Sequence, residues 1–329
     1  MIDIVIPTYE GAEVLKPCLL SLKHNTTEGA KIVIADDHSK SSRMREILKG
    51  QNVILNGSGT QGFPHNVNWT VNQLDSEFIC LLNSDTEVTR GWLSFMMEEM
   101  TQPSVGVVGC KLVYPPSRPT MGGLVQHAGV ATNRQGLPYH IYRGYDPLAP
   151  EVNRRLEINC VTFACALIRR DCWEDIGGLD ERYVGGQFED VHFCREARDA
   201  GWRVVYTPRA LVYHVEHGSG EEFAFKSGTP NRNKLVKAWP NYPSDEGLFE
   251  FSWKHLWQPQ HFEGLAAVCH KQRQRDADRT ARNGNLGDYL MEQQVLAVQP
   301  YDKVSPKQRE EARAMAKSVL HYLQSLEGA

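Results

Sequence analysis

The stretch of sequence that decides the fold is Phe78-Ile79-Cys80-Leu81-Leu82-Asn83-Ser84-Asp85, an apolar run that leads directly into an acidic turn. A short continuous apolar run of this kind predicts a buried strand, covered on both faces as in the parallel sheets of α/β proteins. Open α/β sheets bind their ligands just beyond the carboxyl ends of their strands. Because hard divalent cations prefer oxygen ligands and share them with phosphates, Asp85 is a candidate metal ligand at this edge.

The residues on both sides of this strand alternate between strand-like and helical patterns. Strands are predicted at 2–6, 31–35, 53–55, 105–109 and 203–206, and helices at 14–22, 65–74, 92–100 and 189–200. This alternation predicts an α/β protein with a mostly parallel, doubly wound sheet. Residues 114–150 are rich in Pro, Gly and Arg, which predicts a long functional loop region.

The character of the chain changes after Trp239, and we expect one domain over residues 1–240 and a helical extension over residues 241–329. Residues 310–326 have the spacing of an amphipathic helix, whose apolar stripe must be buried somewhere. We expect this helix to dock on the first domain, with a homodimer contact or a membrane surface as alternatives. Basic residues at 270–282 alternate with acids, which is typical of a solvated helical face.

Composition excludes several classes of protein. Hydrophobic residues make up 41% and charged residues 23% of the chain, as in globular domains. The net charge of −4 gives no basic excess that would favour nucleic acid. Eight cysteines without a CxxC pair predict reduced thiols. With no apolar run of about 18–20 residues and a strand-like start in place of a signal peptide, we expect a cytoplasmic protein without a transmembrane segment, or one at the inner face of a membrane.

Carboxylates follow two strands of the predicted sheet, as Asp36-Asp37 and as Asp85. Either could be a helix cap, but two at one sheet edge favour a site. The loop after the first strand lacks GxGxxG, which excludes a dinucleotide fingerprint, and the glycines at 57–62 are not followed by the lysine of a P-loop. An aspartyl phosphatase would have Asp where Pro7 stands.

Taken together, these motifs resemble the family-two inverting glycosyltransferases with the GT-A fold, of the rhamnosyltransferase or polysaccharide type. The resemblance covers about residues 2–240 and rests on these segments: Ile4–Tyr9, Ile34–Ser39, Gly62-Phe63 with Asn66 and Asn68, Leu82–Thr86, Gly177–Glu181, Phe188–Asp190, Ala200–Trp202, and Pro208–His214. It implies a nucleoside-diphosphate sugar as donor and an acceptor that is a glycan, a lipid-linked glycan, a protein or a modified nucleobase.

The resemblance also implies roles for individual residues. The donor would contact Pro7, Thr8, Tyr9, Glu10, Asp36, Gly62, Phe63, Asn66, Asn83 and Ser84. Asp85 would bind Mn²⁺ or Mg²⁺, and because Asn83 replaces the first Asp of a full DxD motif, His214 is the candidate for a further ligand. Asp190 would be the general base, with Glu189 and His192 on the acceptor side; His192 stands where the family often has a second Asp.

Other interpretations of the same residues stay open. Glu189 and Asp190 also suit the first turn of a helix, where the dipole favours acids. His214 and His217, with Cys160 and Cys165, could form a zinc site, although no closed ligand set has a recognisable spacing. Two rival functions are a nucleotidyltransferase on a related core and a non-catalytic protein that binds nucleotide sugars or glycans.

Overall fold

The computed structural model describes residues 1–26, 29–118, 121–134, 136–216 and 221–245. The predicted helix at 310–326 with its homodimer contact, the basic residues at 270–282 and His217 lie outside these described residues. Among the described residues, no helix is both long enough and apolar enough to span a bilayer.

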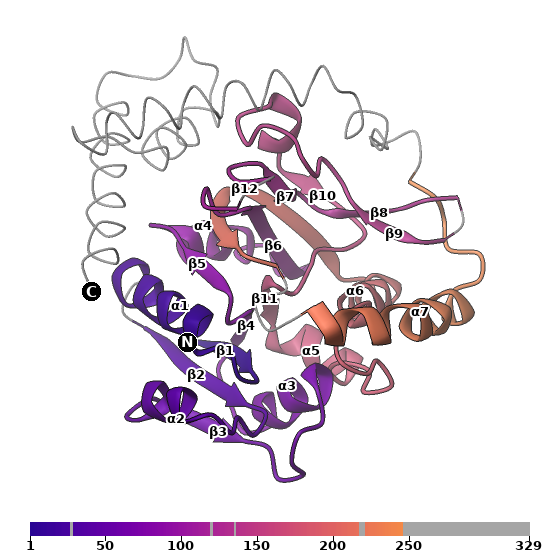
Figure 1. Ribbon diagram of the computed structural model, residues 1–329. Coiled ribbons are helices and arrows are strands. Elements are labelled where there is room, and N and C mark those ends of the chain that lie inside the picture. Colours follow the sequence, from indigo (N-terminus) through magenta and orange to yellow (C-terminus); the bar gives the residue numbers. More distant parts are fainter. Residues whose placement is uncertain (27–28, 119–120, 135, 217–220, 246–329) are drawn as a thin grey trace, which may run out of the picture.

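One large sheet dominates the described part of the chain (Figure 1). Its strands are β1 (Ile2–Thr8), β2 (Ala30–Asp36), β3 (Val53–Leu55), β4 (Phe78–Leu82), β5 (Thr86–Val88), β6 (Val105–Val113), β7 (Val125–His127), β10 (Leu156–Glu157), β11 (Cys165–Arg169) and β12 (Arg203–His214). A separate pair is formed by β8 (Val130–Thr132) and β9 (Pro138–His140). The helices are α1 (Ala12–Asn25), α2 (Ser42–Leu48), α3 (Phe63–Val71), α4 (Trp92–Glu99), the 3₁₀ helix η1 (Pro150–Asn153), α5 (Arg170–Ile176), α6 (Glu189–Asp199) and α7 (Glu221–Ala238).

The main strands follow the order β10-β12-β6-β11-β4-β1-β2-β3. The half from β4 to β3 is parallel throughout, which confirms the predicted doubly wound α/β class. The apolar segment at 161–168 supplies most of β11, which enters between β4 and β6 and runs antiparallel to both. The parallel pairing of β12 with β6 then extends the sheet on the far side.

Alternation within each strand sends side chains to two separate apolar layers, because successive residues of a strand point to opposite faces. Ile4 and Cys80 belong to the core that includes residues of α1, α2 and α4. Val5 and Leu81 belong to the core that includes residues of α3, α5 and α6. Helices therefore cover both faces of the sheet, and the sheet edge is left for a site.

Strand register brings the ends of several strands to this edge. Thr8 at the end of β1 pairs with Asp36 at the end of β2, and β4 runs parallel on the other side of β1. The long strand β12 has a register shift between Thr207 and Leu211, and beyond it pairs antiparallel with β5. His214 thereby stands opposite Thr86, directly after Asp85.

The segment after α7 packs on the core, where the Trp239 ring contacts His192 of α6 at 4.6 Å between ring centres. The Asp245 carboxylate accepts hydrogen bonds from the main-chain N–H of Thr132 at 2.7 Å and from the Asn159 amide at 2.7 Å. The guanidinium carbon of Arg195 lies 3.8 Å from the centre of the Tyr242 ring. Contacts with the core therefore continue to Asp245, past the predicted boundary at residue 240, which itself stays a prediction.

Candidate active site

Asp85 and His214 meet at the carboxyl edge of the sheet. The Asp85 Oδ1 oxygen lies 3.1 Å from the His214 Nε2 nitrogen, with side chains 7% and 10% exposed. The neighbouring main chains are joined as well, because the Val215 N–H donates to the Asp85 carbonyl at 3.0 Å. The Asn83 side-chain nitrogen lies 3.5 Å from the same imidazole nitrogen. The structure therefore brings all three residues of the predicted metal motif together.

A buried glutamine, which sequence reasoning missed, orients the imidazole. The Gln126 Oε1 oxygen lies 2.6 Å from His214 Nδ1 and can only accept, so Nδ1 carries the hydrogen and Nε2 is directed at Asp85. Gln126 comes from β7, within the segment that the sequence predicts as a loop region. No motif marks it, because its role depends on the pairing of β7 with β6.

The residues at this edge fit a divalent cation that shares its ligands with a substrate. Within the described ranges, no cluster of three or more His, Cys, Asp or Glu side chains could enclose a metal ion. Magnesium-type sites, however, use one or two protein carboxylates and take their other oxygens from phosphates and water. Asp85 and His214 would hold the ion. The zinc alternative gains no support, since Cys160 donates its thiol hydrogen to the Val161 carbonyl.

The predicted base, Asp190, lies in the first turn of α6. Its carboxylate accepts hydrogen bonds from the main-chain N–H groups of Val191 at 2.8 Å and Phe163 at 3.4 Å. Burial raises the pKa of Asp190, and the hydrogen bonds from Val191, Phe163 and Thr162 oppose that rise. Asp190 is therefore held in a fixed orientation, with a pKa nearer to neutrality than an exposed aspartate has.

Glu189 beside it is a buried carboxyl group. Burial, and secondarily the neighbouring charge of Asp190, raise the pKa of Glu189 to about 8. Its Oε2 oxygen is buried, and no hydrogen-bond partner for it is found among the described residues. At neutral pH Glu189 is therefore protonated in the main, and it can donate a hydrogen bond where an ionised carboxylate could only accept.

The two acids at the end of β2, Asp36 and Asp37, form hydrogen bonds with different segments. Asp36 accepts from the Ser39 hydroxyl at 2.5 Å, so it closes the turn after β2. Asp37 holds the glycine-rich loop, because its carboxylate accepts from the N–H of Gln61 at 3.0 Å and of Gly62 at 2.9 Å. From the sequence, Asp37 is expected either as a helix cap or at the sheet edge, so this positioning contact was missed. Asp37 and Gly62 are too far apart in the sequence for a local motif to link them.

The loop after β1 is tied to the same turn. Glu10 has a left-handed backbone with φ of 57°. Its carboxylate accepts from the N–H of Ser41 at 3.1 Å and also from that of Lys40. Hydrogen bonds from the Ser41 side chain and the Lys40 main chain lower the pKa of Glu10. The carboxylate is thus hydrogen-bonded to the two residues that precede α2. Pro7, Thr8 and Tyr9 lead up to Glu10 from the end of β1.

The Gly62-Phe63 segment approaches residues 177–190, which we call the acceptor-side motif because they include the predicted acceptor-side residue Glu189 and the predicted base Asp190. A Cβ atom on Gly62 would lie 3.3 Å from the main-chain nitrogen of Gly185, so only glycine allows this approach without displacement. The Asn68 amide bridges to the same motif, donating to the Leu179 carbonyl and accepting from the Leu179 N–H, both at 2.8 Å. The Asn66 amide donates to the Ala35 carbonyl at 2.7 Å.

His192 is surrounded by side chains of the fold. The Tyr183 hydroxyl lies 3.0 Å from its Nδ1, and a Glu196 carboxylate oxygen lies 3.2 Å from its Nε2. The Trp239 ring packs edge-on against the imidazole at 4.6 Å between centres. Burial lowers the pKa of His192. These contacts pack α6 against the residue that follows α7, and an acceptor role for His192 stays a prediction.

Residues 3–177 match the family described as Glycosyl transferase family 2. The chain belongs to this family. It is 35% identical over 164 residues to the O-antigen biosynthesis protein RfbC of Myxococcus xanthus, a match that covers 48% of this chain and 12% of that one. It is 25% identical over 247 residues to an N-acetylglucosaminyl-diphospho-decaprenol L-rhamnosyltransferase of Mycobacterium tuberculosis, covering 68% of this chain and 78% of that one.

Solved structures confirm the GT-A glycosyltransferase fold. GalNAc-T7, crystallised with UDP, GalNAc and Mn²⁺, superposes with a TM-score of 0.54 at 14% identity, covering 65% of this chain and 43% of that one. At this identity the likeness shows the fold alone. The chain spans less than half the length of several curated relatives that it matches, the Myxococcus protein among them.

Proposed function

We propose that this chain is a metal-dependent, inverting glycosyltransferase that moves a sugar from a nucleoside-diphosphate donor to an acceptor hydroxyl. One observation supports this above all. The Asn83 N–H donates to the Ala164 carbonyl at 2.9 Å, and the N–H of the adjacent Phe163 donates to the Asp190 carboxylate at 3.4 Å. The metal motif and the proposed base therefore hold neighbouring peptide groups of one segment, which supports the proposal that they serve a single reaction centre.

The donor half of the site would be the edge formed by β1, β2 and β4. Pro7, Thr8, Tyr9 and Asp36 would hold the base and ribose, and Glu10, Gly62, Phe63, Asn66, Asn83 and Ser84 would line the rest of the donor site. Asp85 and His214 would hold Mn²⁺ or Mg²⁺ against the diphosphate. When bound, the cation neutralises the charge that grows on the leaving nucleoside diphosphate.

The acceptor half would centre on Asp190. Its carboxylate takes the proton of the acceptor hydroxyl while the oxygen attacks the anomeric carbon from the side opposite the diphosphate, which inverts that carbon in one step. A raised pKa suits this role, because a general base is most effective when its pKa lies near the working pH. Glu189, protonated at neutral pH, would donate a hydrogen bond to the acceptor without competing for its proton.

The names of the relatives favour one acceptor class. One relative carries a name for rhamnosyl transfer to a decaprenol-linked sugar and another a name for O-antigen biosynthesis. We therefore place a lipid-linked or polysaccharide glycan ahead of a protein or a modified nucleobase as acceptor, and a hexose or deoxyhexose as the sugar transferred. The predicted cytoplasmic location, with the inner face of a membrane as its alternative, would suit such an acceptor.

A donor screen by thermal shift tests the proposal. Uridine, thymidine and guanosine diphosphate sugars are compared with and without Mn²⁺, since a ligand that binds only the folded protein raises its apparent stability. We expect one donor to stabilise the protein in the presence of the metal and to be turned over with an acceptor. Stabilisation without hydrolysis or transfer would indicate a binding protein, and pyrophosphate release from a nucleoside triphosphate would indicate a nucleotidyltransferase.

A further inference from the structure

A second cluster of polar side chains lies directly beyond the end of β12, around the carboxylate of Glu216. The Tyr114 hydroxyl donates to Glu216 Oε2 at 2.9 Å. Arg143 donates from Nη2 to both carboxylate oxygens, at 2.9 Å and 3.1 Å. Arg118 Nη2 lies 3.5 Å from Oε2 as well. Three donor groups from two separate segments thus converge on one carboxylate oxygen.

The three donors, Tyr114, Arg118 and Arg143, form a cradle around this carboxylate. The guanidinium carbon of Arg118 lies 4.4 Å from the centre of the Tyr114 ring, and that of Arg143 lies 5.6 Å from it. The ring is fully buried, whereas the side chains of Arg118, Arg143 and Glu216 keep 30%, 37% and 17% exposure. Within the described part of the chain, the ion pairs of this cluster join two guanidinium groups to one carboxylate. Paired guanidinium groups with a hydroxyl are a donor set that suits phosphate oxygens.

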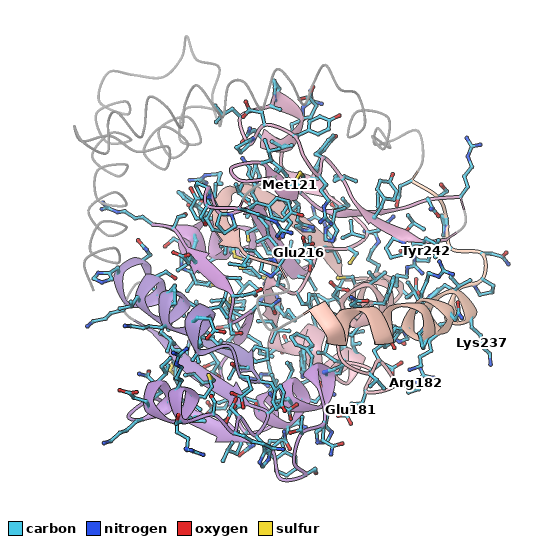
Figure 2. The ribbon with its side chains drawn as sticks, in the orientation of Figure 1. Met121, Glu181, Arg182, Glu216, Lys237 and Tyr242 are labelled. Atoms are coloured by element: carbon cyan, nitrogen blue, oxygen red, sulfur yellow. The ribbon has the colours of Figure 1, made fainter. Side chains whose placement is uncertain are left out.

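This cradle adjoins the proposed metal edge. Arg118 also donates through Nη1 to the Val215 carbonyl, and the Val215 N–H donates to the Asp85 carbonyl at 3.0 Å. One residue before Val215 stands His214, which contacts Asp85. Figure 2 shows Glu216 near the middle of the view, whereas Lys237 lies at its margin. A group bound by Arg118 and Arg143 would therefore lie next to the place where a diphosphate is expected.

The backbone at Glu216 is in a conformation that a non-glycine residue rarely adopts, with φ of 63°. Such a conformation persists where its surroundings hold it. Here the surroundings include Arg118, Arg143 and Tyr114, which contact the Glu216 side chain. Glu216 is thus an acidic residue held in an unfavourable backbone state by a set of anion-binding donors.

We propose that Tyr114, Arg118 and Arg143 form a phosphate-binding subsite, which the Glu216 carboxylate fills until a phosphate group displaces it. The phosphate comes either from the donor diphosphate or from a phosphate on the acceptor. This choice of source rests on the proposed function, whereas binding of free phosphate does not. The competing interpretation is a purely structural ion-pair network, in which Glu216 never leaves.

Calorimetry with pyrophosphate in EDTA, at constant ionic strength, separates these interpretations. In Glu216→Gln the side chain that competes with the ligand loses its negative charge. We expect pyrophosphate to bind about tenfold more tightly, since a neutral amide pairs with guanidinium groups less strongly than a carboxylate does. The double variant E216Q/R143Q should lose that gain, and E216Q/R143K should recover only part of it, because lysine cannot present two parallel donors. Folding of each variant is checked by circular dichroism.

The matched control is Glu157→Gln. Glu157 pairs with Arg203 at 2.8 Å at the opposite end of β12, so this change removes the same charge from a similar ion pair. Pyrophosphate affinity should stay at the wild-type value there. Equal affinity in wild type and E216Q, an equal gain in E157Q, or a gain that survives in E216Q/R143Q would each overturn the phosphate subsite.

Two further ligands identify the source of the phosphate. If the subsite takes the donor diphosphate, R143Q weakens binding of a nucleoside diphosphate with Mn²⁺. If it takes an acceptor phosphate, R143Q weakens binding of an alkyl diphosphate and leaves the nucleotide unaffected. If R143Q leaves the affinity for both ligands unchanged, the proposal is contradicted. A protein that binds no nucleotide at all would refute the proposed function, but the metal-free pyrophosphate comparison would still decide on the subsite.

Discussion

The His214 imidazole lies 3.1 Å from the Asp85 carboxylate, although the two residues are far apart in the sequence. The antiparallel pairing of β5 with β12 produces this contact, since it sets His214 opposite Thr86. The side-chain oxygen Oε1 of Gln126 then fixes the imidazole so that Nε2 is directed at Asp85. The two side chains should therefore act as one unit, and substitutions at both should not be additive.

The first prediction concerns Asp85. Asp85→Asn should abolish metal-dependent binding of nucleoside diphosphates and lower turnover by about 10²-fold or more, because a bound cation contributes several kcal/mol of charge stabilisation. Calorimetry with and without Mn²⁺, together with a transfer assay, measures both effects. The control is Asp171→Asn, which removes an exposed acid in the first turn of α5. Full wild-type activity in excess EDTA would refute the metal role.

The second prediction concerns Asp190. Asp190→Asn should lower transfer by about 10²–10⁴-fold, since an amide cannot accept the acceptor proton. Donor affinity should stay close to the wild-type value. Glu196→Gln on the same helix is the control, because Glu196 contacts His192 and is 43% exposed. An equal loss of donor binding in D190N would instead point to a structural role for this carboxylate.

The third prediction concerns the pH dependence of stability. The pKa of Glu189 is raised from 4.5 to about 8 in the folded protein, so between these values the folded state binds more protons than the unfolded state. Stability should therefore fall as pH rises through this window. Glu189→Gln removes this titration and should flatten the dependence of the unfolding free energy on pH. Its gain in stability over the wild type should be largest above about pH 8. One pKa unit corresponds to about 1.4 kcal/mol. Urea unfolding at several pH values measures it, and parallel profiles for the two proteins would contradict it.

The fourth prediction concerns the link between α3 and the acceptor-side motif. Asn68→Ala removes both hydrogen bonds to Leu179 and leaves its buried N–H and carbonyl unpaired. The free energy of unfolding should fall by about 2 kcal/mol or more, because an unsatisfied buried polar group costs about 1–3 kcal/mol. The control is His65→Ala, which breaks the more exposed pair with Glu181 and should cost less than about 1 kcal/mol. Similar losses of unfolding free energy in the two variants would contradict a large stabilising contribution from the hydrogen bonds between Asn68 and Leu179.

Much of the first half of the fold could be predicted from local pattern. The apolar run at 78–82 is strand β4, and its end leaves Asp85 at the sheet edge as expected. The sequence could not reveal that β11 would lie antiparallel beside β4. An apolar run indicates that a strand is buried, but it carries no information on which neighbour the strand pairs with or in which direction.

The sequence by itself determined the α/β class, the alternation of the main strands and helices up to β6 and the acids at the strand ends, because strand and helix periodicity are local properties of the chain. It predicted residues 114–150 as a loop region, where the structure has β7, β8 and β9. Only the tertiary structure decided that Gln126 orients His214, that Asp37 holds the loop at Gly62, and that Arg118 and Arg143 meet at Glu216. Each of these contacts joins segments that are distant in the chain. Sheet pairing and packing of the whole domain set such contacts, and no local pattern records them.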